Sequence, residues 1–303
     1  MQTTKDIELT GTVSESASMG PGRIAGYSLA AMLPLAVIAT TMWPMLDTAL
    51  NDGTTSHIPL IPLVSAWFIF AERRHIFSQV SPAGKIGVLL TALGLICMAI
   101  GEFGLESLGA QNRLSISLLG LALIWTGVFG LFWGDNALKA ASFPFEFLFF
   151  MIPIPSAVLD NVIRFLQVGS ADTAAAMFQL SGVPFLRHGF EFALPGVTIQ
   201  VAQECSGIRS TLALLIVVVL MCHLFLRTFA KKALLCILVV PLAVFKNGLR
   251  IFTLSVLSIY VNPGFLTGNL HRRGGIVFFV AALLPLILAL SILRKTEGAD
   301  AEL

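Results

Sequence analysis

The sequence predicts an all-α polytopic membrane protein with about eight transmembrane helices, and three observations predict it. First, 56% of the 303 residues are hydrophobic and only 12% are charged, whereas a typical soluble domain carries about 25% charged residues. Second, the mean hydropathy is +0.87. Third, several apolar runs approach or reach the ~20 residues that a helix needs to cross a bilayer.

Apolar windows mark the expected spans along the chain. They cover residues 24–46, 58–71, 86–101, 114–133, 143–155, 207–226, 233–250 and 274–293. The second and fifth windows are short for a full crossing, so their boundaries are open. The first window is too long for a signal-peptide core and no clean small-residue cleavage site follows it, so we expect a retained anchor.

Charges in the loops predict the orientation. Cytoplasmic loops are enriched in lysine and arginine, and the stretch RTFAKK at 227–232 and the pair Arg294-Lys295 are the clearest such clusters. Loop 47–57 has no lysine or arginine. We therefore expect a multi-pass protein of the cell inner membrane with both termini in the cytoplasm. A single domain would span 24–295, between a disordered N-terminus (1–23) and a short tail (296–303).

The mixed-polarity segment 156–206 is expected outside the cytoplasm. Its first part has apolar residues at helical spacing, which predicts an amphipathic helix on the bilayer surface or on the bundle. Its second part alternates on both sides of Pro195-Gly196, which predicts a small β-hairpin leading to Cys205. Such a hairpin has backbone groups that hydrocarbon cannot satisfy, so it must lie among headgroups or be covered by protein.

Cys205 is the first candidate functional residue. It lies at the start of a predicted helix, where backbone N–H groups favour a thiolate, and Arg209 lies one turn further on the same face. Glu204, if it lies close to the thiol, disfavours the thiolate, because it adds a second negative charge. From these neighbours alone, a reactive thiol and a cysteine that only packs at an interface are about equally good interpretations. Three other cysteines lie in apolar runs and are expected to be small buried hydrophobes: Cys97, Cys222 and Cys236.

In the predicted topology Asn247, Arg250 and His271 fall at the same outer membrane boundary as Cys205. Asn247 and Arg250 are three residues apart and share a helix face. Arg250 alone could be an arginine that snorkels to the interface, and His271 could be an ordinary loop residue. Together with Cys205 they suggest acyl transfer: a thiolate nucleophile, a histidine that moves protons and an arginine that stabilises an oxyanion.

Other functions fit the sequence less well. The net charge of +2 and the absence of a basic block argue against nucleic acid as a partner. The cysteines have no metal-ligand spacing, and no metal or cofactor is expected. A transporter would need polar groups near the midplane of the membrane rather than at one end. A non-catalytic subunit of a polysaccharide export system, with a structural Cys205, is the remaining alternative.

The chain resembles the exosortase/archaeosortase family. The stretches that carry the resemblance are SHIPLIPL (56–63), FPFEFLFFMIPIP (143–155), GVPFLRHGFEFALPGVTIQVAQECSGIRS (182–210), KNGLR (246–250) and LHRRGG (270–275). The combination of ECSGIRS, a downstream NxxR and a later histidine is the most specific part.

The resemblance implies a membrane cysteine protease or transpeptidase. Such enzymes act on exported proteins whose C-terminal signal combines a Pro-Glu-Pro-like motif (PEP-CTERM), one transmembrane helix and a basic end. The protein would be cut through a thioester on Cys205 and transferred to an acceptor that the sequence does not identify. Bacterial members look linked to exopolysaccharide and biofilm production.

The resemblance also implies roles for individual residues. The catalytic cysteine, arginine and histidine fall on Cys205, Arg250 and His271. Related archaeal enzymes have an arginine in the role of the histidine, so the third role stays open among His271, Arg272, Arg273 and His57. His188 is a further rival base on the outer face. The residues expected to bind substrate or support the site are Glu204, Ser206, Gly207, Arg209 and Asn247.

Overall fold

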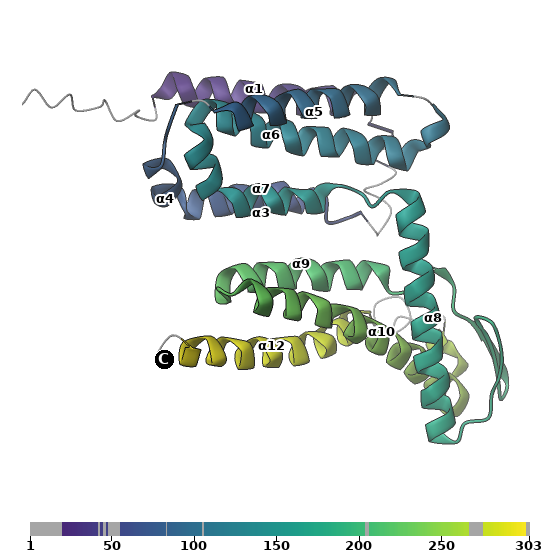
Figure 1. Ribbon diagram of the computed structural model, residues 1–303. Coiled ribbons are helices and arrows are strands. Elements are labelled where there is room, and N and C mark those ends of the chain that lie inside the picture. Colours follow the sequence, from purple (N-terminus) through teal and green to yellow (C-terminus); the bar gives the residue numbers. More distant parts are fainter. Residues whose placement is uncertain are drawn as a thin grey trace, which may run out of the picture. The chain divides into compact units, whose positions relative to one another are not determined.

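The computed structural model describes residues 20–41, 43–44, 47, 55–82, 84–104, 106–203, 206–266 and 275–300 (Figure 1). Contacts along the backbone divide the chain into two compact units. Unit 1 comprises Met1–Leu46 and Leu60–Ile152, and unit 2 comprises Asp47–Pro59 and Pro153–Leu303. The expected disordered N-terminus (1–23) lies almost wholly outside the described residues.

The predicted all-α polytopic class is confirmed. Six helices of the described chain are long and apolar enough to cross a membrane: α1 (Pro21–Thr41), α5 (Lys85–Phe103), α6 (Ala110–Ala140), α9 (Ile208–Phe225), α10 (Phe229–Tyr260) and α12 (Gly275–Asp300). A seventh follows if Ser142–Met151 and Ser156–Ser181 form one bent span. The protein is therefore a multi-pass membrane protein.

The count of eight spans is not confirmed, and the difference lies in the two short windows. Window 58–71 corresponds to α3 (Leu60–Ala71), which has 12 residues and is shorter than the ~20 needed for a full crossing. Window 143–155 corresponds to the short helices α7 (Ser142–Phe147) and η2 (Leu148–Met151).

Unit 1 is built on the close packing of α5 against α6. The short 3-10 helix η1 (Glu106–Leu108) lies between them in the chain. Small residues allow this approach, because a β-carbon on Gly94 of α5 would lie 2.8 Å from the carbonyl oxygen of Gly120 of α6. Helix α1 joins them through Trp125, whose indole Nε1 donates to the Ala31 carbonyl at 2.8 Å.

Aromatic rings join the remaining elements of unit 1. Trp133 of α6 packs 4.6 Å from the ring of Tyr27 of α1 and 5.5 Å from that of Phe77 of α4 (Arg73–Ser78). Ser65 of α3 donates to the Pro144 carbonyl of α7 at 2.7 Å. Phe129 of α6 packs 4.9 Å from Phe145 of α7, so that α1, α3, α4, α6 and α7 form one packed body.

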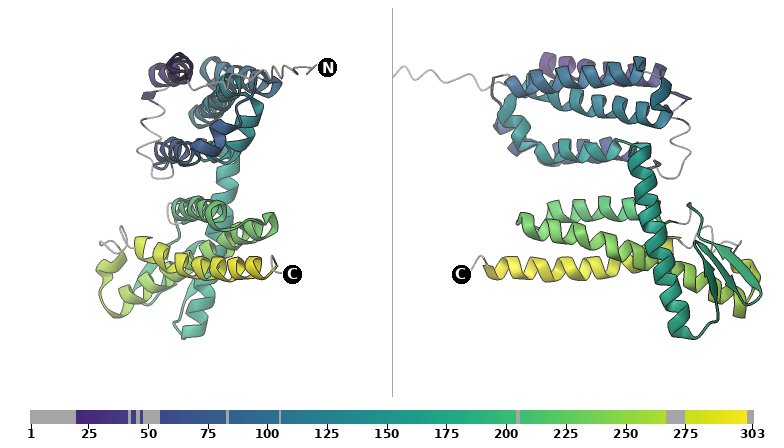
Figure 2. Two further views of the ribbon diagram at one scale, coloured as in Figure 1. Left: turned by 90° about the vertical axis from the view of Figure 1, so that its left-hand side faces the viewer. Right: turned by 45° about the vertical axis from the view of Figure 1, so that its right-hand side comes forward.

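Unit 2 contains α9, α10 and α12, which lie side by side (Figures 1 and 2). They enclose a shared apolar core formed by Leu214, Val218, Leu235, Val239, Ala282 and Leu286. The predicted window 233–250 is only part of α10, which continues to Tyr260. The continuation IFTLSVLSIY remains helical because its apolar side chains pack against α8 and a small sheet.

Helix α8 (Ser156–Ser181) confirms the helix predicted at the start of segment 156–206, and its position outside the membrane stays a prediction. It runs across the group of α9, α10 and α12 beside the second half of α10 (Figure 2). The two helices approach closely where both have glycines. A β-carbon on Gly248 would lie 2.5 Å from Thr173 Cβ, and one on Gly169 would lie 2.9 Å from Val244 Cγ1.

The predicted hairpin is confirmed and has one additional strand. β1 (Leu186–His188), β2 (Glu191–Leu194) and β3 (Val197–Gln200) form an antiparallel sheet in that order, and Leu194 pairs with Val197 across Pro195-Gly196. Phe192 of β2 is fully buried and packs 5.7 Å from Phe178 of α8. One face of the sheet therefore packs on residues of α8 and α10, which is one of the two placements expected for the hairpin.

Candidate active site

The structure describes part of the expected site. Glu204, Cys205, His271, Arg272 and Arg273 lie outside the described residues. The described members are Ser206, Gly207, Arg209, Asn247, Arg250 and His57. Their contacts show how the chain is held before and after Cys205.

Helix α10 carries the polar group of the site in little more than one turn. Lys246 and Asn247 are 5% and 1% exposed, and Arg250 is half-buried. From Phe229 to Asn247 the helix rises by about 27 Å, close to the ~30 Å thickness of the hydrocarbon core. An upright α10 with Phe229 at one membrane surface therefore places these residues near the other surface.

Asn247 contacts two other elements. Its Nδ2 donates to the Oγ of Ser170 on α8 at 3.0 Å. On another side it lies against Gly207, where an added β-carbon would lie 3.0 Å from Asn247 Cγ. Asn247 therefore fixes α10 against α8 and against the start of α9, one helical turn from Arg250.

Gly207 forms the turn that begins α9. Its φ of +81° is in the left-handed region, which glycine adopts without the penalty that a β-carbon brings. Its carbonyl accepts hydrogen bonds from the backbone and the hydroxyl of Thr211, both at 2.9 Å, and from Ser210 Oγ at 3.0 Å. The Nζ of Lys246 donates to the same Ser210 hydroxyl. Lys246 is thus joined to the turn through Ser210.

The chain before Cys205 is held as well. Val201 donates its backbone N–H to the Phe190 carbonyl at 2.9 Å, and its own carbonyl accepts a hydrogen bond from Gln167 Nε2 of α8. Ser206 donates its backbone N–H to the Gln203 carbonyl at 3.0 Å. Cys205 therefore belongs to a short connection whose two ends, Val201 and Gly207, are both fixed to helices of unit 2.

Ser206 and Arg209 differ in burial. Ser206 is 1% exposed, and its Oγ makes no hydrogen bond to any residue that the structure describes. Arg209 is exposed on the first turn of α9. The N-terminus of α9 carries the partial positive charge of a helix start. Three cationic side chains add to it: Arg209 on the first turn of α9, Lys246 bonded to Ser210 of that turn, and Arg250 one turn beyond Lys246 on α10. Negative charge is favoured in these surroundings.

The two rival histidines occupy different places. His57 lies half-buried in the turn at 55–59, and the segment Asp47–Pro59 belongs to unit 2, the unit that also contains Arg250. His188 is exposed at the end of β1. His57 therefore remains a candidate for the third role beside His271.

Four residues near the site were not singled out from the sequence: Gln167, Ser170, Ser210 and Lys246. A signal existed for Lys246, because a lysine within an apolar stretch is costly without a partner and often functional. Ser170 and Gln167 carried no such signal, since serine and glutamine on an amphipathic helix are ordinary.

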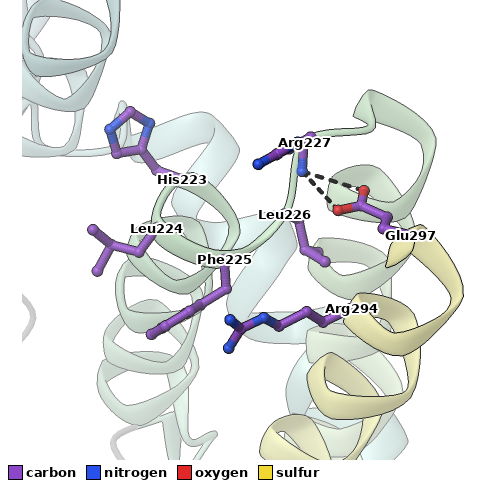
Figure 3. A pocket seen from close by; sticks show the side chains of 7 residues that line it. All are labelled: His223, Leu224, Phe225, Leu226, Arg227, Arg294 and Glu297. Carbon is purple, nitrogen blue, oxygen red and sulfur yellow. Dashed lines mark hydrogen bonds between the residues drawn. The ribbon is translucent and has the colours of Figure 1, made fainter. Parts of the chain in front are cut away.

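A separate cavity of about 450 Å³ lies at the opposite end of α9 (Figure 3). Glu297 of α12 accepts hydrogen bonds there from the backbone N–H groups of Arg227, at 3.0 Å, and Thr228, at 2.7 Å. Arg294 lies 5.6 Å from the ring of Phe225. These contacts hold α12 to the α9–α10 connection, and none of the expected site residues lines the cavity.

Within the described chain, no three His, Cys, Asp or Glu side chains are grouped so as to hold a metal ion. The described site is instead a set of hydroxyl, amide and cationic side chains. Such a set can orient a peptide and stabilise developing negative charge.

A family model described as transmembrane exosortase matches residues 47–288 of the chain. The match begins after α1, covers the rest of unit 1 and most of unit 2, and includes all the expected site residues. No curated protein matches the chain. No solved structure matches it either.

Proposed function

The chain belongs to the transmembrane exosortase family, and on this premise we propose that it is a cysteine transpeptidase of the inner membrane. The family is one of membrane protein-sorting enzymes. The proposed substrates are exported proteins with a PEP-CTERM-like signal, cleaved at the extracytoplasmic face and passed to an acceptor. The exported proteins are expected to take part in exopolysaccharide and biofilm production.

One observation supports this function above the others. The turn at Gly207 lies against Asn247, one helical turn from Arg250. Cys205 is two residues before Gly207 in the sequence, and the proposal brings its thiol to Arg250 at this turn. A nucleophile and a cation held close together suit the formation of a tetrahedral oxyanion.

The proposed reaction proceeds in two transfers. The Cys205 thiolate attacks the carbonyl carbon of the scissile peptide, and Arg250 stabilises the negative charge that develops on the carbonyl oxygen. The C–N bond then breaks as His271 donates a proton to the leaving amine, which leaves a thioester on Cys205. His271 removes a proton from the acceptor nucleophile, which attacks the thioester and releases the thiolate.

The supporting residues have separate proposed tasks. Ser206 offers a buried hydroxyl that can bond a peptide group of the substrate. Asn247 positions the Gly207 turn, and Arg209 and Glu204 contribute charge at the edge of the site. The substrate helix would place its motif at the outer surface while its basic end stays in the cytoplasm, in accord with the positive-inside rule.

The test is replacement of Cys205 by alanine in cells that express a tagged substrate with such a signal. We expect full-length substrate to accumulate, and we expect the wild-type enzyme to form an adduct that hydroxylamine releases. Cys97→Ala is the matched control, since Cys97 lies in α5 of unit 1. Normal processing by Cys205→Ala would refute the enzyme and favour a transporter or an export subunit.

A further inference from the structure

Lys246 is a buried cation that the proposed reaction does not use. It is 5% exposed and lies in the apolar helix α10, beside Asn247 and one turn from Arg250. A buried ammonium group is costly unless hydrogen bonds compensate for the lost water. The contacts of its Nζ therefore show what this lysine does.

The Nζ of Lys246 donates to the hydroxyl of Ser210 on the first turn of α9. Ser210 in turn donates to the carbonyl of Gly207 at 3.0 Å. A continuous path of hydrogen bonds thus leads from α10 to the left-handed turn that follows Cys205. Because the hydroxyl proton of Ser210 is directed at a backbone carbonyl, Ser210 is arranged as a link rather than as a nucleophile.

We infer that Lys246 is a positioning residue of the proposed active site, which acts through Ser210 to hold the turn after Cys205. The inference rests on the proposed function. The side chain of Asn247 packs against the same turn, whereas Lys246 is hydrogen-bonded to it through the hydroxyl of Ser210. Loss of the link leaves the protein folded but lets the thiol shift relative to the peptide carbonyl.

The experiment measures substrate processing by membranes that contain Lys246→Met, Ser210→Ala or both changes. We expect each single variant to lower kcat by about 10- to 100-fold, the cost of misplacing a reacting group by ~1 Å, with KM nearly unchanged. The double variant should be no slower than the slower single variant, because both changes remove the same link. Ser210→Thr retains the hydroxyl and should restore most of the rate.

Thr211→Val is the matched control. It also removes a hydrogen bond to the Gly207 carbonyl, but that bond stays within the first turn of α9 and does not reach α10. We expect a rate close to wild type. If Thr211→Val is as slow as Lys246→Met, the turn depends on its local bonds and the role of Lys246 is refuted.

The outcomes separate this inference from the function on which it rests. A wild-type rate in Lys246→Met, with Cys205→Ala inactive, overturns the positioning role alone. Processing by Cys205→Ala overturns the function itself. Additive losses in the double variant also refute the link. If Lys246→Met does not accumulate in the membrane, Ser210→Ala and Ser210→Thr carry the same comparison, and equal rates for these two would overturn it.

Discussion

Gly207 and Asn247 are packed so closely that a β-carbon on residue 207 would lie 3.0 Å from the Cγ of Asn247. Gly207 begins α9 and Asn247 lies within α10, 40 positions further along the chain. The contact joins the two helices at the turn that follows Cys205. The geometry of that turn is therefore set by tertiary packing as well as by local sequence.

Gly207→Ala is expected to reduce both stability and processing. A side chain in the left-handed region costs about 1–2 kcal/mol, and the β-carbon must also displace Asn247. We expect processing of a tagged substrate to fall by at least ~10-fold, since small displacements of a reacting group are costly.

Gly196→Ala separates the two causes. Gly196 has a similar φ of +77°, but its added β-carbon would meet no atom within 4 Å. It should show the backbone penalty in thermal unfolding and little change in processing. Equal losses of processing in the two variants would show that contact with Asn247 does not matter.

Asn247→Leu is expected to destabilise unit 2. It removes the donor to Ser170 and leaves a buried hydroxyl without that bond, which costs about 1–3 kcal/mol. Thermal unfolding in detergent is the measurement. Ser170→Ala alone should cost less, and the double variant should cost less than the sum of the two, because the residues share one hydrogen bond. Strict additivity would argue against that bond.

Arg250→Lys is expected to impair catalysis despite the retained charge. Lysine lacks the planar group of several donors with which arginine can hold an oxyanion. We expect kcat to fall by about 10²-fold, the range for the loss of one donor in an oxyanion site. Arg187→Lys is the control, because Arg187 forms an outlying ion pair with Asp172 at 2.8 Å. Full activity in Arg250→Lys would show that only the positive charge at position 250 is needed, and not the planar geometry of arginine.

The proposed orientation predicts which positions a membrane-impermeant thiol reagent can reach. In a chain whose native cysteines are replaced by alanine, Glu191→Cys on β2 should be labelled in intact cells. Lys295→Cys near the end of α12 should be labelled only after permeabilisation. Both positions are exposed, so burial does not bias the comparison. The reverse pattern would invert the topology and place Cys205 at the cytoplasmic face.

Much of the fold could be predicted because apolar length and alternation act locally. The windows 86–101 and 207–226 correspond closely to α5 and α9, and Pro195-Gly196 forms the predicted turn of the sheet. The extent of α10 could not be predicted. Its continuation past Arg250 is stabilised by tertiary contacts with α8 and the sheet, which a window of hydropathy does not contain.

The candidate site was predictable only in part. The spacing of Asn247 and Arg250 correctly predicts that they share one region of a helix. The partner of Asn247 is Ser170, 77 positions earlier, and nothing in the residues around Ser170 points to it. Lys246 stands out as a lysine in an apolar stretch, but nothing near it in the sequence identifies Ser210 as its partner. Their meaning depends on how α9 and α10 cross, which is a property of the packed protein.

The length of α10 has a consequence for the substrates. Its 32 residues rise by about 48 Å, some 18 Å more than the hydrocarbon core, so in the proposed orientation its last turns, about 12 residues, stand above the membrane. Arg250, about 32 Å along this helix, marks a fixed height at the surface. The enzyme would then cleave only substrates whose scissile bond lies at that height above the bilayer. Five extended residues inserted between motif and helix, about 17 Å, would lift the scissile bond past that height and abolish cleavage.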